Sequence, residues 1–128
     1  MKKLVFLLLA VMILTACGQN KENGQGAVYV NITAEEAKQI MDSEEGYIIL
    51  DVRTQEEYDQ GHIPGAIVIP HEKISEKAEE VLTDKDQLIL VYCRSGRRSK
   101  IAAEALVELG YTNIKEFGGI IDWPYETE

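Results

Sequence analysis

The chain has 128 residues, of which 22 are acidic and 13 basic, and its net charge is −9. The acidic balance disfavours binding to nucleic acid, because such binding depends on neutralising phosphates with lysine and arginine. The length suits one small domain with a single core, and the sequence shows neither an internal repeat nor a second domain.

The chain begins with a segment typical of export signals. Two lysines precede an unbroken apolar run of eleven residues, Leu4 to Leu14, which is too short to be a stable membrane anchor. Residues 14–17 resemble the lipobox of bacterial lipoproteins. By that resemblance residues 1–16 are a signal peptide, and Cys17 carries a lipid that holds the protein outside the cytoplasm on a bacterial membrane. A plain secretory signal with an incidental cysteine is the alternative.

The region after the signal predicts a tether and then a domain. Residues 17–27 form the lipidated N-terminus and a flexible tether that lacks large apolar side chains, and residues 28–128 form the domain. If Cys17 is acylated, Cys93 is the remaining thiol and has no partner within the chain. Cysteines outside the cytoplasm usually pair. An inert buried cysteine is one interpretation, but the arginines and glycine around Cys93 argue against it.

Strands and helices alternate along the domain. Thr-x-x-Glu capping boxes at 33–36 and 54–57 each predict the start of a helix. Unbroken apolar strands separated by helices predict an α/β fold with a mostly parallel five-stranded sheet and helices on both faces. We expect strands at 28–32, 47–50, 66–69, 88–92 and 114–117, and helices at 34–41, 54–60, 72–82 and 102–109.

Polar residues follow two of the predicted strands. Cys93 ends the most apolar one, and Asp51 and Arg53 come directly after the strand at 47–50. Ligands bind at the carboxyl ends of parallel strands, so these residues can be neighbours in space. Arg53 and Glu57 stand four apart at the start of a helix, and we expect them to pair. For Asp51 and Arg53 we therefore favour a supporting role over one in lining the pocket.

The loop after Cys93 has the features of an anion site. A helix N-terminus and cationic neighbours both favour the thiolate, and successive backbone N–H groups in such a loop can form an anion-binding nest. Four of the 13 basic residues lie between Arg94 and Lys100. A solvated basic face is the alternative, but the coincidence with the thiol favours a site for a small anion.

Three segments of the domain carry short motifs, in chain order. They are Asp51-Val52-Arg53 with Glu57-Tyr58 and 61–66, then Cys93-Arg94-Ser95-Gly96-Arg97-Arg98-Ser99, then Gly118-Gly119-Ile120 with Trp123. The first resembles the upstream motif of the rhodanese family, the second its active-site loop and the third its C-terminal motif. The matches cover essentially the whole of residues 28–128.

This resemblance implies a rhodanese-like fold and an enzyme of the thiosulfate sulfurtransferase type. Cys93 would take a sulfane sulfur from an anionic donor, hold it as a persulfide and pass it to a thiol or cyanide. The resemblance implies no cofactor or metal, and we expect a monomer. The loop residues Arg94, Ser95, Gly96, Arg97 and Arg98 would bind the donor and stabilise the persulfide, with support from Asp51, Arg53 and Ser99.

Two other functions remain open from the sequence. Phosphatases with a C-x₅-R loop, and arsenate reductases, place an arginine six positions after the cysteine, where this chain has Ser99. The last arginine here is Arg98, so the loop is one residue shorter and suits a sulfur atom better than a tetrahedral phosphate. The second alternative is a persulfide carrier, or a surface thiol-redox module, that serves one partner and has little turnover alone.

Overall fold

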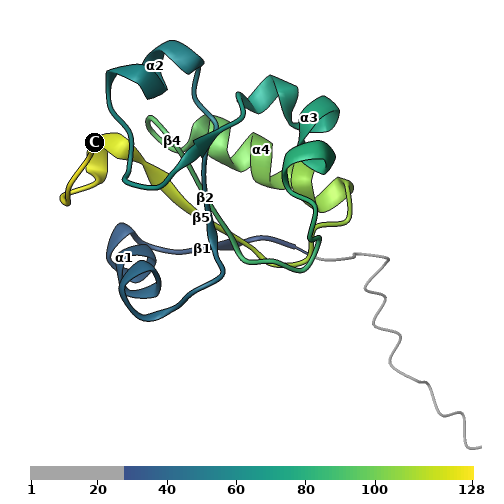
Figure 1. The fold of residues 1–128 in the computed structure, drawn as a ribbon, viewed down its shortest axis with the longest axis horizontal. Coiled ribbons are helices and arrows are strands. Elements are labelled where there is room, and N and C mark those ends of the chain that lie inside the picture. The colour runs from purple at the N-terminus through teal and green to yellow at the C-terminus, as the bar shows by residue number, and fades with distance from the viewer. Residues whose placement is uncertain (1–27) are drawn as a thin grey trace, which may run out of the picture.

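The computed structural model describes residues 28–128, which contain a five-stranded sheet in the order β1-β5-β4-β2-β3 (Figure 1). Every neighbouring pair of strands is parallel, which confirms the predicted α/β class. The signal peptide, Cys17 and the tether lie outside the described residues. The strands are β1 (Val30–Asn31), β2 (Ile48–Asp51), β3 (Ile67–Val68), β4 (Ile89–Cys93) and β5 (Ile114–Gly119).

Two of the helices begin where a side chain satisfies their first N–H groups. Both predicted capping boxes are present, with the Thr33 and Thr54 hydroxyls accepting hydrogen bonds from the third residues of their helices. The last helix begins at Arg97, earlier than the apolar pattern predicts, because Gly96 takes a left-handed φ of 106° and turns the chain into it. The helices are α1 (Ala34–Ser43), α2 (Gln55–Gln60), α3 (Ile74–Val81) and α4 (Arg97–Glu108), with 3-10 turns η1 (His71–Lys73) and η2 (Ile120–Asp122).

The core consists of two hydrophobic clusters, one on each face of the sheet. The alternation of β4 divides them, since Ile89, Val91 and Cys93 point to one face and Leu90 and Tyr92 to the other. Helices α3 and α4 cover the Cys93 face, and α1 with the C-terminal segment covers the opposite face (Figure 1). All five residues of β4 are buried, so its end is held from both sides.

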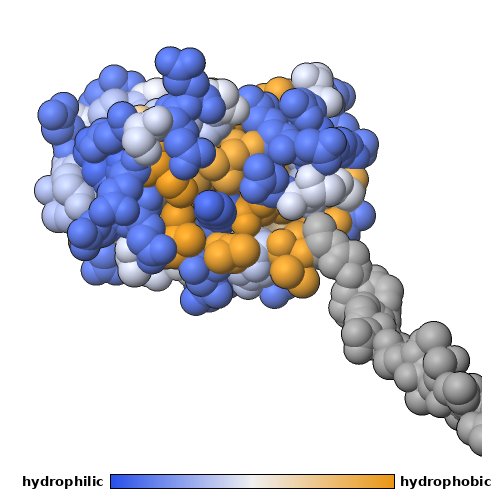
Figure 2. Space-filling view, turned by 90° about the horizontal axis from the view of Figure 1, so that it is seen from below, coloured by the Kyte–Doolittle hydropathy of each residue, from blue (hydrophilic) through white to orange (hydrophobic). Residues whose placement is uncertain are grey.

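The edge strand β1 and the residues just before it leave apolar side chains in contact with solvent. Val28 is 68% exposed and Val30 50% exposed, and apolar residues gather near the start of the described chain on the face seen in Figure 2. Within residues 28–128, no helix combines the length and apolar character needed to cross a membrane.

Candidate active site

Cys93 is the last residue of β4, and its side chain lies beneath the loop that leads into α4. The residue is only 1% exposed, and it is the one free cysteine within the part of the chain that the structure describes. Its Sγ accepts a hydrogen bond from the backbone N–H of Gly96 at 3.0 Å. The left-handed turn at Gly96 aims this N–H at the sulfur, so the loop and the first turn of α4 form a cradle for it.

Opposing influences act on the protonation of Cys93. Burial raises the pKa of the thiol, since it removes water from the thiolate. The hydrogen bond between Sγ and the Ser99 side chain, in which the thiol is the donor, and the backbone N–H groups of Ser99, Gly96 and Ser95 together lower the pKa and outweigh burial. The pKa of Cys93 is therefore lower than that of an ordinary cysteine, which favours the nucleophilic thiolate.

Ser99 and Glu116 lie directly behind the sulfur. The Ser99 hydroxyl is 3.4 Å from Cys93 Sγ and 2.6 Å from Oε1 of Glu116 on β5. The same Oε1 accepts a hydrogen bond from the backbone N–H of Gly118 at 2.9 Å. Ser99 is fully buried and Glu116 is 2% exposed, so a carboxylate shielded from solvent is part of the site. The sequence alone did not single out Glu116, which stands beside Lys115 in the predicted strand at 114–117.

The three arginines of the loop are not equivalent. Arg94 and Arg97 are exposed at the mouth of the site. Arg98 instead points to α2, where its Nη1 and Nη2 donate to the two carboxylate oxygens of Glu57 at 2.7 and 2.9 Å. The hydrogen bond from Arg98 lowers the pKa of Glu57 to about 2. This bidentate pair connects the start of α4 to α2 and fixes one side of the loop.

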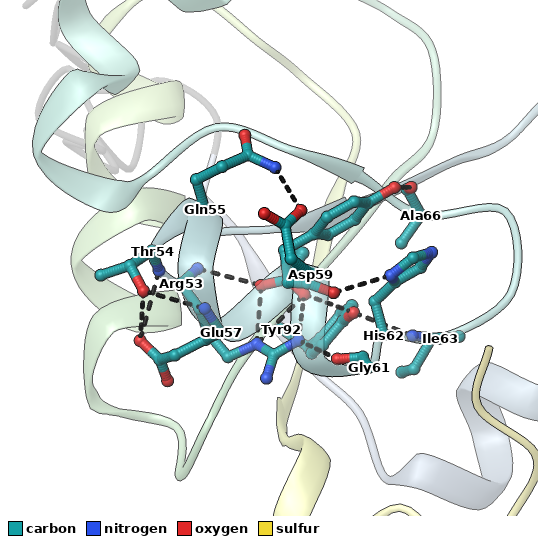
Figure 3. A network of polar contacts seen from close by, with 12 residues as sticks. Arg53, Thr54, Gln55, Glu57, Asp59, Gly61, His62, Ile63, Ala66 and Tyr92 are labelled. Atoms are coloured by element: carbon teal, nitrogen blue, oxygen red, sulfur yellow. Dashed lines mark hydrogen bonds and ion pairs between the residues drawn. The ribbon is translucent and has the colours of Figure 1, made fainter.

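The predicted pair between Arg53 and Glu57 is wrong. The Arg53 guanidinium binds Asp51 instead, with Nη2 2.6 Å and Nε 2.9 Å from its carboxylate oxygens, and Nη2 also donates to the Gly61 carbonyl (Figure 3). Asp51 is fully buried and Arg53 is 5% exposed. The adjacent Arg53 cation offsets the cost of burying the Asp51 charge, whereas Glu57 at the rim of α2 reaches Arg98.

Tyr92, whose side chain lies on the face of the sheet opposite Cys93, joins the Asp51–Arg53 pair. The Tyr92 hydroxyl donates to Asp51 Oδ2 at 2.6 Å and accepts the backbone N–H of Ile63 at 3.1 Å (Figure 3). Burial, followed by the bond to Asp51, raises the pKa of Tyr92, so the phenol remains a neutral donor. The group joins the ends of β2 and β4 beside the active loop and supports it from behind.

Comparison with known proteins decides the family. The sequence pattern of the rhodanese-like domain matches residues 33–124, which is most of the chain. The chain belongs to the rhodanese-like domain family. It is 42% identical over 73 residues to thiosulfate sulfurtransferase PspE of Escherichia coli, an alignment that covers 57% of this chain and 70% of PspE. Membership of this family supports sulfurtransferase activity in general.

Two further rhodanese relatives differ in what their names describe. YrkF of Bacillus subtilis, whose name describes a sulfur carrier, is 41% identical over 98 residues. That alignment covers 76% of this chain but only 52% of YrkF, so the chain spans about half of that protein. The solved structure of an Escherichia coli rhodanese with anions is 38% identical, with a TM-score of 0.60 over 64% of this chain and 96% of that one.

The rhodanese motif at 118–119 has a steric basis in this structure. Gly118 has a φ of +86°, which side chains rarely adopt. At Gly119 a Cβ would collide with the backbone carbonyl of Arg94, because the end of β5 passes directly under the active loop. The Ile121 N–H also donates to the Arg94 carbonyl at 3.2 Å. The segment after β5 thus forms the floor of the loop.

Proposed function

We propose that this rhodanese is a sulfurtransferase that moves a sulfane sulfur from an anionic donor such as thiosulfate to a thiol or cyanide. The observation that carries the proposal is the placement of Cys93 Sγ against the Gly96 N–H, in a loop whose hydrogen bonds lower the thiol pKa. The name of PspE supports thiosulfate as the donor class.

The two half-reactions need only the sulfur of Cys93. The thiolate attacks the outer sulfur of thiosulfate, an S–S bond forms, and the donor's S–S bond breaks as sulfite leaves with its electron pair. The product carries its negative charge on the terminal sulfur of the persulfide. An acceptor thiolate or cyanide then attacks that sulfur, and Cys93 returns as a thiolate. Backbone N–H groups at the loop stabilise each anion in place.

The two exposed arginines of the loop would attract the anionic donor electrostatically. Arg94 and Arg97 are exposed at the mouth and form no ion pair within residues 28–128, whereas Arg98 is held by Glu57. Thiosulfate carries two negative charges, and two cations in a protein of net charge −9 would raise its local concentration. Arg98 would act chiefly by holding the loop.

A serine in place of the nucleophile tests this function. The Cys93→Ser variant should fold normally and lose thiocyanate formation from thiosulfate and cyanide, because a serine hydroxyl cannot hold a transferable sulfur. Thiocyanate is measured colorimetrically under steady-state conditions. Residual activity comparable to that of the unmodified protein would contradict the assignment of Cys93.

A carrier is the second candidate, and the name of YrkF favours it. A carrier would accept one sulfur atom on Cys93 and keep it until a specific protein acceptor binds. Repeated turnover with thiosulfate and cyanide supports the enzyme. A single stoichiometric loading of Cys93 without further turnover supports the carrier.

We also propose that the mature protein is attached to the outer face of a bacterial cytoplasmic membrane, or to another membrane of the envelope, by a lipid on Cys17. The apolar run at 4–14 and the small residues before Cys17 support this proposal. The acceptor would then be an extracytoplasmic molecule.

A further inference from the structure

Glu116 is a buried carboxyl group that sulfur transfer as outlined above does not use. It lies on β5 opposite Val91 of β4, and its side chain points into the space behind the sulfur. Among the described residues, no lysine, arginine or histidine forms an ion pair with it. A carboxylate shielded from solvent and lacking a cation depends on its hydrogen-bond donors. The structure gives it two, the Ser99 hydroxyl and the Gly118 N–H.

The Ser99 hydroxyl has a single proton and several possible acceptors, among which the Gly96 carbonyl at 3.0 Å and the Gly118 carbonyl at 3.4 Å are farther away than Glu116. Glu116 Oε1 is 2.6 Å from Ser99 Oγ, a distance typical of a charge-assisted hydrogen bond, whereas Cys93 Sγ is 3.4 Å away. While Glu116 is ionised, the proton points to Glu116 and Ser99 offers Cys93 a lone pair. That arrangement suits a thiol that donates to Ser99. It does not suit a thiolate, which requires a donor.

The surroundings of Glu116 strengthen this restraint on the sulfur. Cys93 faces it from β4 and Ser99 from α4, and the Tyr29 phenol lies close enough to Glu116 and Glu104 that both carboxylates raise its pKa, after burial. These groups are neutral or negative. Ionising Cys93 would therefore place a second anion in a buried region that already holds one, and like charges disfavour each other there.

We propose that Glu116 is a positioning residue that acts on Cys93 through Ser99. It favours the thiol over the thiolate, and it favours the persulfide, in which the negative charge is on the terminal sulfur, over a charge on Sγ itself. This proposal rests on Cys93 being the sulfur-transfer nucleophile. In the persulfide the charge sits on the terminal sulfur, farther from Glu116 and among the loop N–H groups. Glu116 thus disfavours the bare thiolate more than the persulfide, which makes the thiolate a stronger nucleophile.

The pH dependence of Cys93 alkylation tests the proposal directly. The Glu116→Gln variant keeps an oxygen that can accept from Ser99 and Gly118 but removes the charge. We expect its alkylation profile with iodoacetamide to move to lower pH by about one pH unit. At high pH its limiting rate should fall about threefold, because a less basic thiolate is a weaker nucleophile. Plotted against pH, the alkylation rates of Glu116→Gln and of the unmodified protein should therefore cross.

The experiment follows the Cys93 peptide of the full chain by mass spectrometry, so that Cys17 does not interfere. Glu80→Gln, which removes an exposed carboxylate from α3, is the matched control and should leave the profile unchanged. If Glu116→Gln fails to fold, Glu116→Asp serves instead. It withdraws the carboxylate from Ser99 by one methylene and should move the profile in the same direction, by less.

The outcomes separate cleanly. Suppose that Glu116→Gln shifts the alkylation profile to lower pH, and that this shift is smaller when Ser99→Ala is also present. That result supports action through Ser99. A move of equal size in that background would overturn the route through Ser99. An unchanged profile, or one moved to higher pH because Glu116 normally accepts the thiol proton, would overturn the proposal. Alkylation needs no sulfur donor, so this result is independent of whether thiosulfate is a substrate.

Discussion

At the scale of single residues, Cys93 depends on neighbours that come from other parts of the chain. The Gly96 N–H and Ser99 come from the loop and the first turn of α4, and Glu116 comes from β5. Hydrogen bonds lower the thiol pKa against the effect of burial. The nucleophile is thus a product of the folded loop rather than of the cysteine alone.

The Arg98–Glu57 pair gives a pH-dependent contribution to stability. The folded-state pKa of Glu57 is about 2, below the value of about 4.3 in unfolded chains. The pair therefore stabilises the fold fully above about pH 4.3, and this stabilisation is lost as pH falls toward 2. We expect Glu57→Gln to lower the free energy of unfolding by about 1 kcal/mol at pH 7, since the pair is partly exposed.

Urea unfolding at two pH values measures this effect. The difference between Glu57→Gln and the unmodified protein should be present at pH 7 and smaller at pH 3. Asp59→Asn, which removes an exposed carboxylate from the same helix, is the control. A difference that stays constant down to pH 3 would show that the carboxylate charge of Glu57 is not the source.

At the scale of elements, the site is an assembly of segment ends. The loop after β4 lies over the end of β5, α2 holds it through Glu57, and the Asp51–Arg53–Tyr92 group joins β2 to β4 behind it. These connections are short, and the Asp51–Arg53–Tyr92 group is buried, so movement of one segment displaces the others. Loop geometry therefore depends on the packing of β5 as much as on the loop sequence.

The close approach at Gly119 predicts a large effect of one methyl group. In Gly119→Ala the Cβ collides with the Arg94 backbone, so the loop must move. We expect a loss of sulfur transfer of about 100-fold, the scale of a misplaced catalytic group. Gly46→Ala is the control, since Gly46 also has a positive φ but open space around it. That variant should cost about 1 kcal/mol of stability and retain activity. Equal activity losses in both variants would contradict the steric account.

The sequence predicted the elements well because their signals are local. Apolar runs, capping boxes and terminal glycines predict strands and helices from neighbouring residues. The pairing of Arg53 was mispredicted because spacing alone cannot show that Asp51 is buried beside it. Glu116 was missed for the same reason, since its contacts reach residues 17 positions away and depend on the register of β5 against β4.

At the scale of the whole molecule, we propose that sulfur transfer takes place outside the cytoplasm, at a membrane to which a lipid on Cys17 attaches the protein. A chain of net charge −9 with a small cationic mouth suits capture of anions from solution. The Cys17→Ser variant should lose lipid attachment and appear in the soluble or secreted fraction, because acyl chains on that residue supply the membrane affinity. Cell fractionation followed by immunoblotting measures this. Retention of the variant in the membrane fraction would contradict anchoring through Cys17.

The central claim is that Cys93 carries a sulfur atom during transfer. Mass spectrometry of the full chain after exposure to thiosulfate, with mapping to the Cys93 peptide, tests it most directly. A gain of one sulfur atom on that peptide, removed again by cyanide and missing in Cys93→Ser, is the predicted result. No added sulfur on Cys93 in a protein that still forms thiocyanate would contradict the account.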